Sequence, residues 1–340
     1  MTIIVPCRNE ARYLPYSLGS AVAQDYPADR LEFVVADGLS DDGSGEIARE
    51  ILARSGHRFE VISNPDRITP IALNRCLERA RGDVILYLIA HCELAPDYVR
   101  RSVEILERTG ADLVGGTIET KGRSTLGRAI ALALSSPFGV GRVAFRTRTG
   151  HSGFVDTVAL GAYRRDVFER VGPFDPAFVR NQDAELSFRI TQSGGKIWLD
   201  GGLRSIYHSR PSLRALWRQH FHTGASKVQI LAKHRRLPAW RHYVPGAFVL
   251  AVVASLVGAV IARQPLLVLT ALGPYAAALI AATTWTVRRE LRLWPLVATA
   301  MATLHFSYGS GFLSGVKRLL PKRRQRAAPS GNGRLSSSRS

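Results

Sequence analysis

Short apolar runs alternate with longer amphipathic stretches over the first 120 residues of the chain. The apolar runs are rich in β-branched residues and read TIIVP, LEFVVAD, FEVIS, DVILYLIA and ADLVGG, a pattern typical of buried strands. Between them, the sequence predicts helices over residues 13–24, 45–55, 71–80 and 97–109. Strands that alternate with helices in this way predict an α/β fold, with a mostly parallel sheet and helices on both faces.

Polar loops directly follow three of the predicted strands. PCRNE follows the first strand, DGLSDDGS the second and AHCE the fourth. Because ligands of such sheets bind outside the carboxyl ends of the strands, we expect these loops to form the rim of a site. Asp37 ends the second strand, where a carboxylate can accept hydrogen bonds from a nucleotide. Asp42 or Ser44 then caps the next helix, and an ordinary helix start is the alternative explanation of this loop.

The pattern is less regular after residue 120. The pattern predicts a short amphipathic helix over residues 126–134. It also predicts a strand followed by a helix in FVDTVALGAYRRDVFERV and a further strand in KIWLD. A helix with acidic residues in its first turn begins at NQDAEL. Residues 212–235 predict a basic and aromatic helix of the kind that lies on a membrane surface.

The C-terminal region contains uncharged segments long enough to cross a bilayer. Val244–Ala262 and Leu266–Val287 each approach the roughly 20 residues that such a crossing needs. Trp294–Val316 is a third candidate, interrupted by polar residues and glycines. Basic residues follow the second segment and fill the KRRQR tail, and positive charges favour the cytosolic side. We therefore predict a two-span hairpin, with residues 294–316 interfacial or re-entrant.

Charge is divided unevenly along the chain. Residues 1–200 hold 25 Lys and Arg against 26 Asp and Glu, whereas residues 201–340 hold 21 against a single acid, Glu290. The apolar segments within the basic half indicate an anionic membrane as its partner and not nucleic acid. The N-terminus shows no signal-peptide pattern, so we expect residues 1–240 in the cytosol. Cys7, Cys76 and Cys92 have no CxxC spacing and are expected to be buried or neutral thiols.

The polar motifs form an ordered series. Pro–x–x–Asn–Glu and Asp–Gly–x–Ser–x–Asp–Gly–Ser are followed by RGD before a strand that ends in AH, then by VDTVALGAYRRDVFERVGPFD and NQDAEL. Over residues 2–227, this series resembles the family 2 glycosyltransferases, which have the GT-A fold. It is most similar to the membrane-attached enzymes of succinoglycan-type exopolysaccharide assembly.

The resemblance implies transfer of a sugar from a nucleotide-diphosphate donor, with inversion at the anomeric carbon. It makes Asp183 of NQDAEL the general base that takes the proton of the attacking hydroxyl. Glu185 would orient the acceptor or a neighbouring side chain. The residues expected at the nucleotide are Pro6, Asn9, Glu10, Asp37 and Arg81.

The chain departs from the family at the metal motif. The family carries Asp–x–Asp or Asp–x–His at the end of the fourth strand, where this chain has Ile89-Ala90-His91. If this strand end is the metal rim, Ile89 and His91 share one side of the strand, and the ion rests on His91, Glu93 and donor phosphate oxygens. An imidazole ligand favours Mn²⁺ over Mg²⁺. In the alternative, cations such as Arg81 and the basic residues of 210–218 replace the metal.

We therefore expect a GT-A domain over residues 1–240, of which 210–240 are basic membrane-surface helices. A hydrophobic region over 244–316 and a basic, disordered tail over 317–340 complete the chain. The expected location is the inner membrane, with several spans and a cytoplasmic catalytic domain.

The expected activity is transfer of one sugar from a UDP-sugar to a lipid-linked saccharide in exopolysaccharide or cell-envelope glycan synthesis. Polymer extrusion is disfavoured because the QxxRW signature of processive polymerases is absent. A degenerate relative that binds nucleotide or lipid without catalysis is the alternative; Ile89 favours it, and the retained NQDAEL argues against it. A nucleotidyltransferase is disfavoured because PCRNEARYL holds neither glycine nor lysine.

Overall fold

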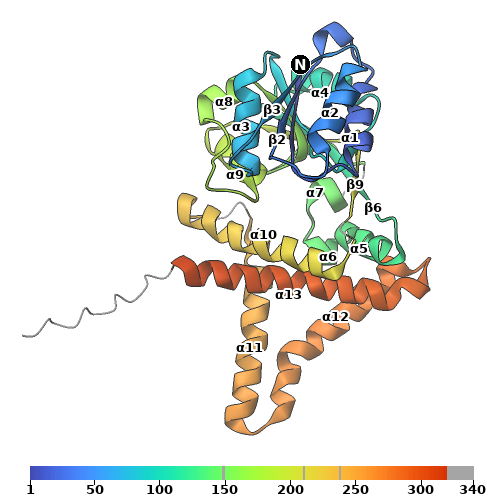
Figure 1. Ribbon diagram of the computed structural model, residues 1–340. Coiled ribbons are helices and arrows are strands. Elements are labelled where there is room, and N and C mark those ends of the chain that lie inside the picture. The colour runs from blue at the N-terminus through green and yellow to red at the C-terminus, as the bar shows by residue number, and fades with distance from the viewer. Residues whose placement is uncertain (148–149, 210, 237–238, 320–340) are drawn as a thin grey trace, which may run out of the picture.

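The computed structural model describes residues 1–147, 150–209, 211–236 and 239–319. It consists of an α/β domain, a layer of helices beneath that domain and a long helical hairpin that projects from the layer (Figure 1). Of the expected tail over 317–340, residues 320–340 lie outside the described residues.

One nine-stranded sheet organises the α/β domain, in the order β3-β2-β1-β4-β8-β6-β9-β5, with β7 paired to β9. Neighbours β1–β2, β2–β3, β1–β4 and β6–β9 are parallel, whereas β8 is antiparallel to β4 and β6, and β5 and β7 are antiparallel to β9. Six of the nine strands therefore run in the same direction. The expected mostly parallel sheet is thereby confirmed. The strands are β1 (Thr2–Cys7), β2 (Glu32–Asp37), β3 (Arg58–Ser63), β4 (Val84–Tyr87), β5 (Cys92–Leu94), β6 (Leu113–Lys121), β7 (Gly153–Phe154), β8 (Ala159–Arg164) and β9 (Ile197–His208).

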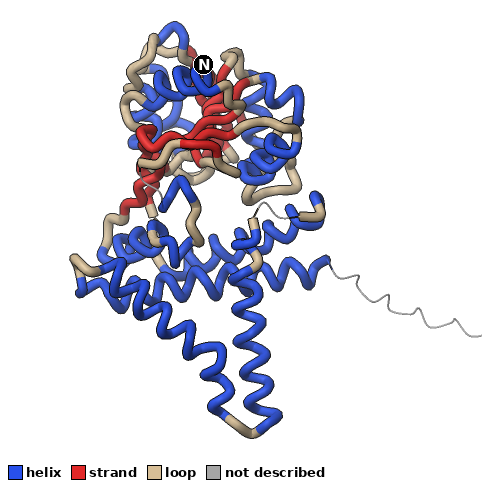
Figure 2. The backbone as a smooth tube through the Cα atoms, turned by 180° about the vertical axis from the view of Figure 1, so that it is seen from behind, coloured by secondary structure: helices blue, strands red, loops and turns tan. Residues whose placement is uncertain are grey.

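Helices cover both faces of this sheet (Figures 1 and 2). Because successive side chains of a strand point to opposite faces, Ile3 and Val5 of β1 join one core cluster and Ile4 joins the other. The helices α1 (Leu14–Val22), α2 (Ser44–Ala53) and α4 (Tyr98–Thr109) pack on the first face. The second face is covered by α3 (Thr69–Arg79), α8 (Asp166–Val171) and α9 (Gln182–Gln192).

The strand order reverses at β1, whose neighbours are β2 on one side and β4 on the other. Loops that leave the carboxyl ends of β1 and β4 diverge at such a point, and the crevice between them is where ligands bind in open α/β sheets. PCRNE spans the end of β1 and the start of the loop after it, and AHCE connects the loop after β4 to β5. The topology therefore brings both predicted motifs to one crevice.

Beneath the carboxyl ends of the strands lies a helical layer (Figure 1). Its long members run side by side, and its short members follow β6. The layer contains α5 (Thr125–Ser135), α6 (Pro137–Val140), α7 (Ala144–Thr147), α10 (Leu213–His234) and α13 (Trp294–Leu319). The segment predicted as interfacial or re-entrant is thus one continuous helix, which lies along α10 and across the hairpin.

Small residues explain how closely these helices approach. A Cβ atom added at Gly311 would overlap the carbonyl group of Phe221 on α10, and one added at Gly224 would overlap the carbonyl group of Tyr308 on α13. Gly309 approaches the backbone of α11 in the same way. The YGSG stretch of the C-terminal region is therefore a packing device that fixes α13 against α10 and α11.

The hairpin consists of α11 (Val244–Ala262) and α12 (Leu269–Val287). Within the described part of the chain, two segments are long and apolar enough to cross a membrane: Trp240–Ala262 and Pro265–Val287. Only 22% of the first apolar window and 6% of the second are buried within the protein, and the hairpin they form projects away from the layer in Figure 2.

Candidate active site

A cleft of about 1220 Å³ separates the α/β domain from the helical layer. The loops after β1, β2 and β4 line one wall, together with the start of α9. Side chains from α6, α10, α11, α12 and α13 line the other wall. The carboxyl ends of the strands and the base of the hairpin therefore share one cavity.

The loops after β1 and β2 hold each other through hydrogen bonds. The backbone N–H of Asn9 donates to Ser40 Oγ at 2.9 Å, and Asn9 Oδ1 accepts from the Asp41 N–H at 3.2 Å. Ser44 Oγ accepts from the Glu10 N–H at 2.8 Å. Asn9 has a φ of 55°, a left-handed conformation that asparagine tolerates better than most residues. Pro6, Asn9 and Glu10 all line the cleft, and their expected contact with a nucleotide stays a prediction.

Asp37 lies at the end of β2 and stabilises the loop after β2 through its contacts with Ser40. Its carboxylate accepts hydrogen bonds from the Ser40 hydroxyl and from the Ser40 N–H, the latter at 3.2 Å. Gly38, the next residue, lines the cleft, whereas Asp37 itself does not. Ser44 is the first residue of α2, and neither it nor Asp42 caps the helix, because Gly43 occupies the cap position.

The expectation for Arg81 is wrong. Arg81 precedes β4, and its backbone N–H donates to Glu32 Oε1 at 2.6 Å, at the start of β2. Asp37 ends that same strand, so the six residues of β2 separate the two positions by roughly 17–20 Å. Arg81 therefore lies at the edge of the sheet opposite the cleft.

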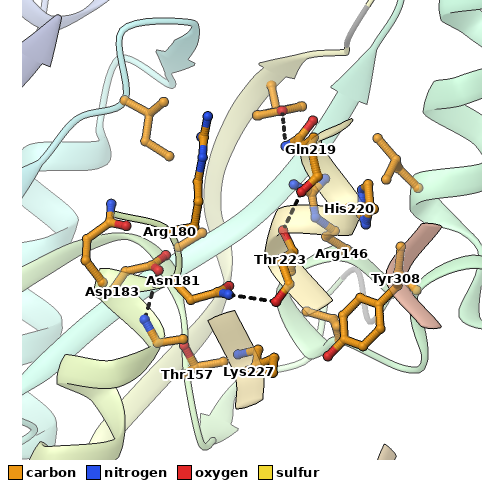
Figure 3. Close-up of a pocket in the computed structure, with 18 of the residues that line it drawn as sticks. Arg146, Thr157, Arg180, Asn181, Asp183, Gln219, His220, Thr223, Lys227 and Tyr308 are labelled. Atoms are coloured by element: carbon orange, nitrogen blue, oxygen red, sulfur yellow. Dashed lines mark hydrogen bonds between the residues drawn. The ribbon is translucent and has the colours of Figure 1, made fainter. Parts of the chain in front are cut away.

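Asp183 enters the cleft from the first turn of α9 (Figure 3). Asn181, with a φ of 58°, precedes the helix, and its amide donates to the Thr223 carbonyl at 3.2 Å and to the Ser226 hydroxyl. These bonds fix the start of α9 against α10. Asp183 Oδ1 accepts from the Ala184 N–H at 2.8 Å. Burial raises the pKa of Asp183, while this bond and the nearby Lys227 charge lower it.

Glu185 does not reach the cleft. Its side chain is 0% exposed and is held by Arg189 at 2.9 Å, Lys233 at 2.7 Å and His234 at 3.0 Å. A buried carboxylate needs such partners, and two of the three belong to α10. Glu185 therefore fastens α9 to α10. Of its two expected roles, the contact with neighbouring side chains agrees with these bonds, and direct contact with a substrate in the cleft does not.

The strand that carries the metal motif ends earlier than predicted. β4 stops at Tyr87, and the Cys92 N–H donates to the Ile89 carbonyl at 2.9 Å, which closes a turn. The alternation of strand side chains therefore does not extend to His91. Ile89 and His91 nevertheless both line the cleft, and His91 Nδ1 lies 3.3 Å from Glu10 Oε1.

Glu93 is engaged elsewhere. Its Oε1 lies 2.6 Å from His208 Nε2, in the pairing of β5 with β9, and Glu93 does not line the cleft. Among the described residues, no three His, Cys, Asp or Glu side chains come together to hold a metal ion. The fit to a divalent cation is therefore limited to His91 and Glu10. In metalloproteins, a carboxylate beside a ring nitrogen commonly orients a metal-binding imidazole.

Cationic side chains that the sequence analysis did not single out line the cleft. Lys227 is only 6% exposed. Arg146 donates to Thr120 Oγ1 at 2.9 Å, and Arg241 pairs with Asp156 at 2.8 Å. The available signal was a basic residue among apolar neighbours on a predicted helix, which Lys227 in SKVQI provides. All three cysteines are buried, and burial raises the pKa of Cys7 and Cys76, as expected for inert thiols.

Comparison with known proteins agrees with this geometry. Residues 2–172 match the model of the family described as glycosyl transferase family 2. The chain is 33% identical over 314 residues to the succinoglycan biosynthesis protein ExoA of Rhizobium meliloti, covering 91% of this chain and 93% of that protein. The dolichyl N-acetyl-α-D-glucosaminyl phosphate 3-β-D-2,3-diacetamido-2,3-dideoxy-β-D-glucuronosyltransferase of Methanococcus voltae is 26% identical over 242 residues, covering 68% of this chain and 74% of the relative.

Solved structures share the fold. The mannosyltransferase PcManGT of Pyrobaculum calidifontis, in complex with GDP-Man and Mn²⁺, aligns with a TM-score of 0.60 at 21% identity, covering 94% of this chain and 87% of that one. Residues 1–349 of TarS from S. aureus, in complex with UDP-GlcNAc, align with a TM-score of 0.52 at 16% identity, covering 93% and 91%. Given the family model and the identity to a relative over most of its length, this protein belongs to glycosyl transferase family 2 and is a glycosyltransferase with the GT-A fold.

Proposed function

We propose that this enzyme transfers one sugar, with inversion, from a nucleotide-diphosphate donor to a lipid-linked saccharide at the cytosolic face of a membrane. One observation carries the proposal. The same cleft that begins at the loops after β1 and β2 continues to Phe248 of α11 and Tyr275 of α12, at the base of the apolar hairpin. A donor at the strand ends and an acceptor anchored in lipid can therefore meet in one cavity.

Asp183 is the proposed general base. The acceptor hydroxyl forms a bond to the anomeric carbon while the bond from that carbon to the diphosphate oxygen breaks. The proton of the hydroxyl passes to the Asp183 carboxylate, and the diphosphate leaves with the electron pair. The position of Asp183 in the first turn of a helix, with one oxygen fixed by the Ala184 N–H, favours its ionised form despite burial.

The donor is proposed to be a UDP-sugar. Its nucleotide would lie against Pro6, Asn9 and the loop braced by Asp37. A divalent cation, Mn²⁺ in preference to Mg²⁺, would rest on His91 with Glu10 behind it and would neutralise the diphosphate. Of the solved structures with this fold, PcManGT contains GDP-Man and TarS contains UDP-GlcNAc, so the donor panel in any assay needs both nucleotides.

The proposed location is the inner membrane, with α11 and α12 as its two spans. Trp240 before α11 is 78% exposed and Trp285 near the end of α12 is 72% exposed. Tryptophans at these positions mark the membrane–water interface, and both lie at the base of the hairpin. In the proposed arrangement, α10 and α13 would lie along the membrane surface and the α/β domain would face the cytosol.

The topology has a direct test. A tag after residue 340 is expected to stay protected from protease in right-side-out vesicles and to become accessible after permeabilisation. A tag inserted between α11 and α12 should show the opposite pattern. Cleavage of the C-terminal tag in intact vesicles would overturn the two-span arrangement.

The activity is tested with the purified enzyme in lipid nanodiscs, labelled UDP- and GDP-sugars, and lipid-linked saccharides extracted from membranes. Transfer should occur to a lipid-linked acceptor, and NMR of the product should show an anomeric configuration opposite to that of the donor. Retention of the donor configuration would refute the inverting mechanism. Absence of transfer to every lipid-linked acceptor would refute the proposed acceptor class.

A second candidate function is nucleotide or lipid binding without catalysis. Ile89, which takes the place of a metal-binding carboxylate on the cleft wall, favours it, and Asp183 at the cleft argues against it. Donor hydrolysis measured with added Mn²⁺ separates the two, because only a competent enzyme releases the nucleotide diphosphate.

A further inference from the structure

Lys227 is a buried cation that faces the catalytic cleft. Its side chain is 6% exposed and lines the cavity. The bonds of Asn181 to Thr223 and Ser226 place Lys227 opposite the first turn of α9, and Figure 3 shows it below Asn181 and Thr223. Within residues 1–147, 150–209, 211–236 and 239–319, no hydrogen bond or salt bridge to its ammonium group occurs.

The carboxylates nearby do not account for this cation. Asp156 is already paired with Arg241 at 2.8 Å. Asp183 influences the charge of Lys227 without forming a salt bridge, so their N–O distance exceeds 4.0 Å. Burial of an ammonium group costs free energy unless an anion or hydrogen-bond acceptor compensates. An anionic substrate group in the cleft would supply that compensation.

Two anions belong to the proposed reaction: the donor diphosphate and the phosphate that links the acceptor saccharide to its lipid. The inverting geometry indicates which of these two anions lies near Lys227. The attacking hydroxyl and the leaving diphosphate lie on opposite sides of the anomeric carbon, and the base stands on the side of the hydroxyl. Lys227 stands beside the base, Asp183, and is therefore on the acceptor side.

The position of Lys227 on α10 points the same way. The backbone of α10 at Gly224, one turn before Lys227, contacts Tyr308 of α13. The membrane-side wall of the cleft is lined by Phe138, Phe248 and Leu304, which suit the hydrocarbon of a lipid. A phosphate between a lipid chain and a sugar would lie where this apolar wall meets the buried cation.

We propose that Lys227 binds a phosphate oxygen of the lipid-linked acceptor and so selects acceptors whose sugar is attached through phosphate. This inference rests on the proposed function, because it uses both the inverting geometry and the lipid-linked acceptor. It assigns Lys227 to acceptor recognition and leaves the donor diphosphate to other groups.

The test compares two acceptors and three variants in nanodiscs. One acceptor carries a saccharide on a lipid diphosphate, and the other carries the same saccharide as a neutral alkyl glycoside. Lys227→Met keeps the length of the side chain and removes the charge, whereas Lys227→Arg keeps the charge. The matched control is Arg218→Met. Arg218 belongs to the basic residues of 210–218 that the sequence offered for the diphosphate, but its side chain is exposed and lies outside the cleft, so the substitution removes a charge from the same helix away from the site.

For Lys227→Met, we expect the KM for the phosphate-linked acceptor to rise by about 10- to 100-fold, the range for loss of a hydrogen bond to a charged group. The KM for the donor and the dissociation constant for UDP should stay within about twofold. Transfer to the neutral acceptor should do the same at a pH where Asp183 is ionised in both the wild type and the variant, because loss of the Lys227 charge also raises the pKa of Asp183. Lys227→Arg should retain most of the preference for phosphate, and Arg218→Met should change neither acceptor selectively.

Three results would overturn the inference. The first is a higher dissociation constant for UDP, which would place Lys227 at the donor. The second is equal loss with both acceptors together with a shifted pH profile, which would show that Lys227 acts only through Asp183. The third is an unchanged phosphate preference in Lys227→Met, the variant that removes the charge. UDP binding reports whether each variant is folded. Failure of the wild type with both acceptors would instead refute the proposed function.

Discussion

Replacement of Asp183 by asparagine removes the proposed proton acceptor and keeps nearly the same shape. The amide oxygen can still accept the hydrogen bond from the Ala184 N–H, which is 2.8 Å long in the wild type. Asparagine also avoids the cost of a buried charge, which is the cause of the raised Asp183 pKa. The substitution should therefore leave the fold intact and affect the chemical step.

The expected loss follows from the role of the base. Proton transfer by a positioned side chain contributes roughly 10²- to 10⁴-fold to the rate. At about 1.4 kcal/mol per factor of ten, this corresponds to about 2.7–5.5 kcal/mol of transition-state stabilisation. Because Asp183 lies at α9 and the nucleotide is expected at the loops after β1 and β2, donor affinity should change by less than about twofold.

The assay is single-turnover transfer from a labelled donor, with UDP affinity measured by calorimetry on the same preparations. Asp175→Asn is the matched control. This acid precedes α9, bonds to Lys233 at 2.7 Å and does not line the cleft, so its transfer rate should remain close to that of the wild type. Full transfer by Asp183→Asn would remove Asp183 from the mechanism, and equal loss of transfer and UDP binding would show damage to the fold instead.

Three further predictions concern the metal, the pH profile and the helical layer. Ile89→Asp adds a carboxylate to the cleft wall and should lower the Mn²⁺ concentration that gives half-maximal transfer. If chelators leave transfer by the wild type unchanged, the proposed metal site is contradicted. Burial raises the pKa of Asp183 and lowers that of Lys227 to about 8. Because the mechanism needs an ionised Asp183, kcat/KM for the phosphate-linked acceptor should rise as the pH passes the pKa of Asp183. Because it also needs a protonated Lys227, kcat/KM should fall above about pH 8. A profile that stays flat through pH 8 would refute the Lys227 half of this argument. Gly311→Val places a side chain against the α10 backbone and should reduce stability by about 1–3 kcal/mol, as overpacking does, whereas Gly258→Val, where no atom lies within 4 Å of an added Cβ, should leave the thermal midpoint in detergent nearly unchanged.

The order of elements and the rim of the site could be predicted from local sequence. Apolar runs indicated the strands, and residues at the end of β1 and directly after it had to lie at its carboxyl end, which is why Pro6, Asn9 and Glu10 line the cleft. The first apolar segment, Val244–Ala262, coincides with α11. These predictions needed only the periodicity of the chain and the direction of each strand.

The direction of the strands alone would have corrected the expectation that Arg81 lies at the nucleotide. Arg81 precedes β4, and a residue before a parallel strand lies at the amino edge of the sheet. The resemblance to a family motif placed it at the nucleotide, against the direction of the strand. Here the strand direction was the more reliable guide because it is a geometric consequence of a parallel sheet.

Only the tertiary structure decided which charges belong to the site. Glu185 meets Lys233 and His234 nearly 50 positions away, and Glu93 meets His208 at a separation of 115 positions; both acids are thereby removed from the cleft. Lys227 belongs to the cleft because of packing that local sequence does not reveal. Asn181 and the glycines of α13 hold α10 in place, but neither provides a hydrogen-bond partner for the Lys227 ammonium group. Periodicity reports the face of an element on which a residue lies. Whether a buried charge is compensated depends on which other element packs on that face, and that is set by the packing of the whole chain.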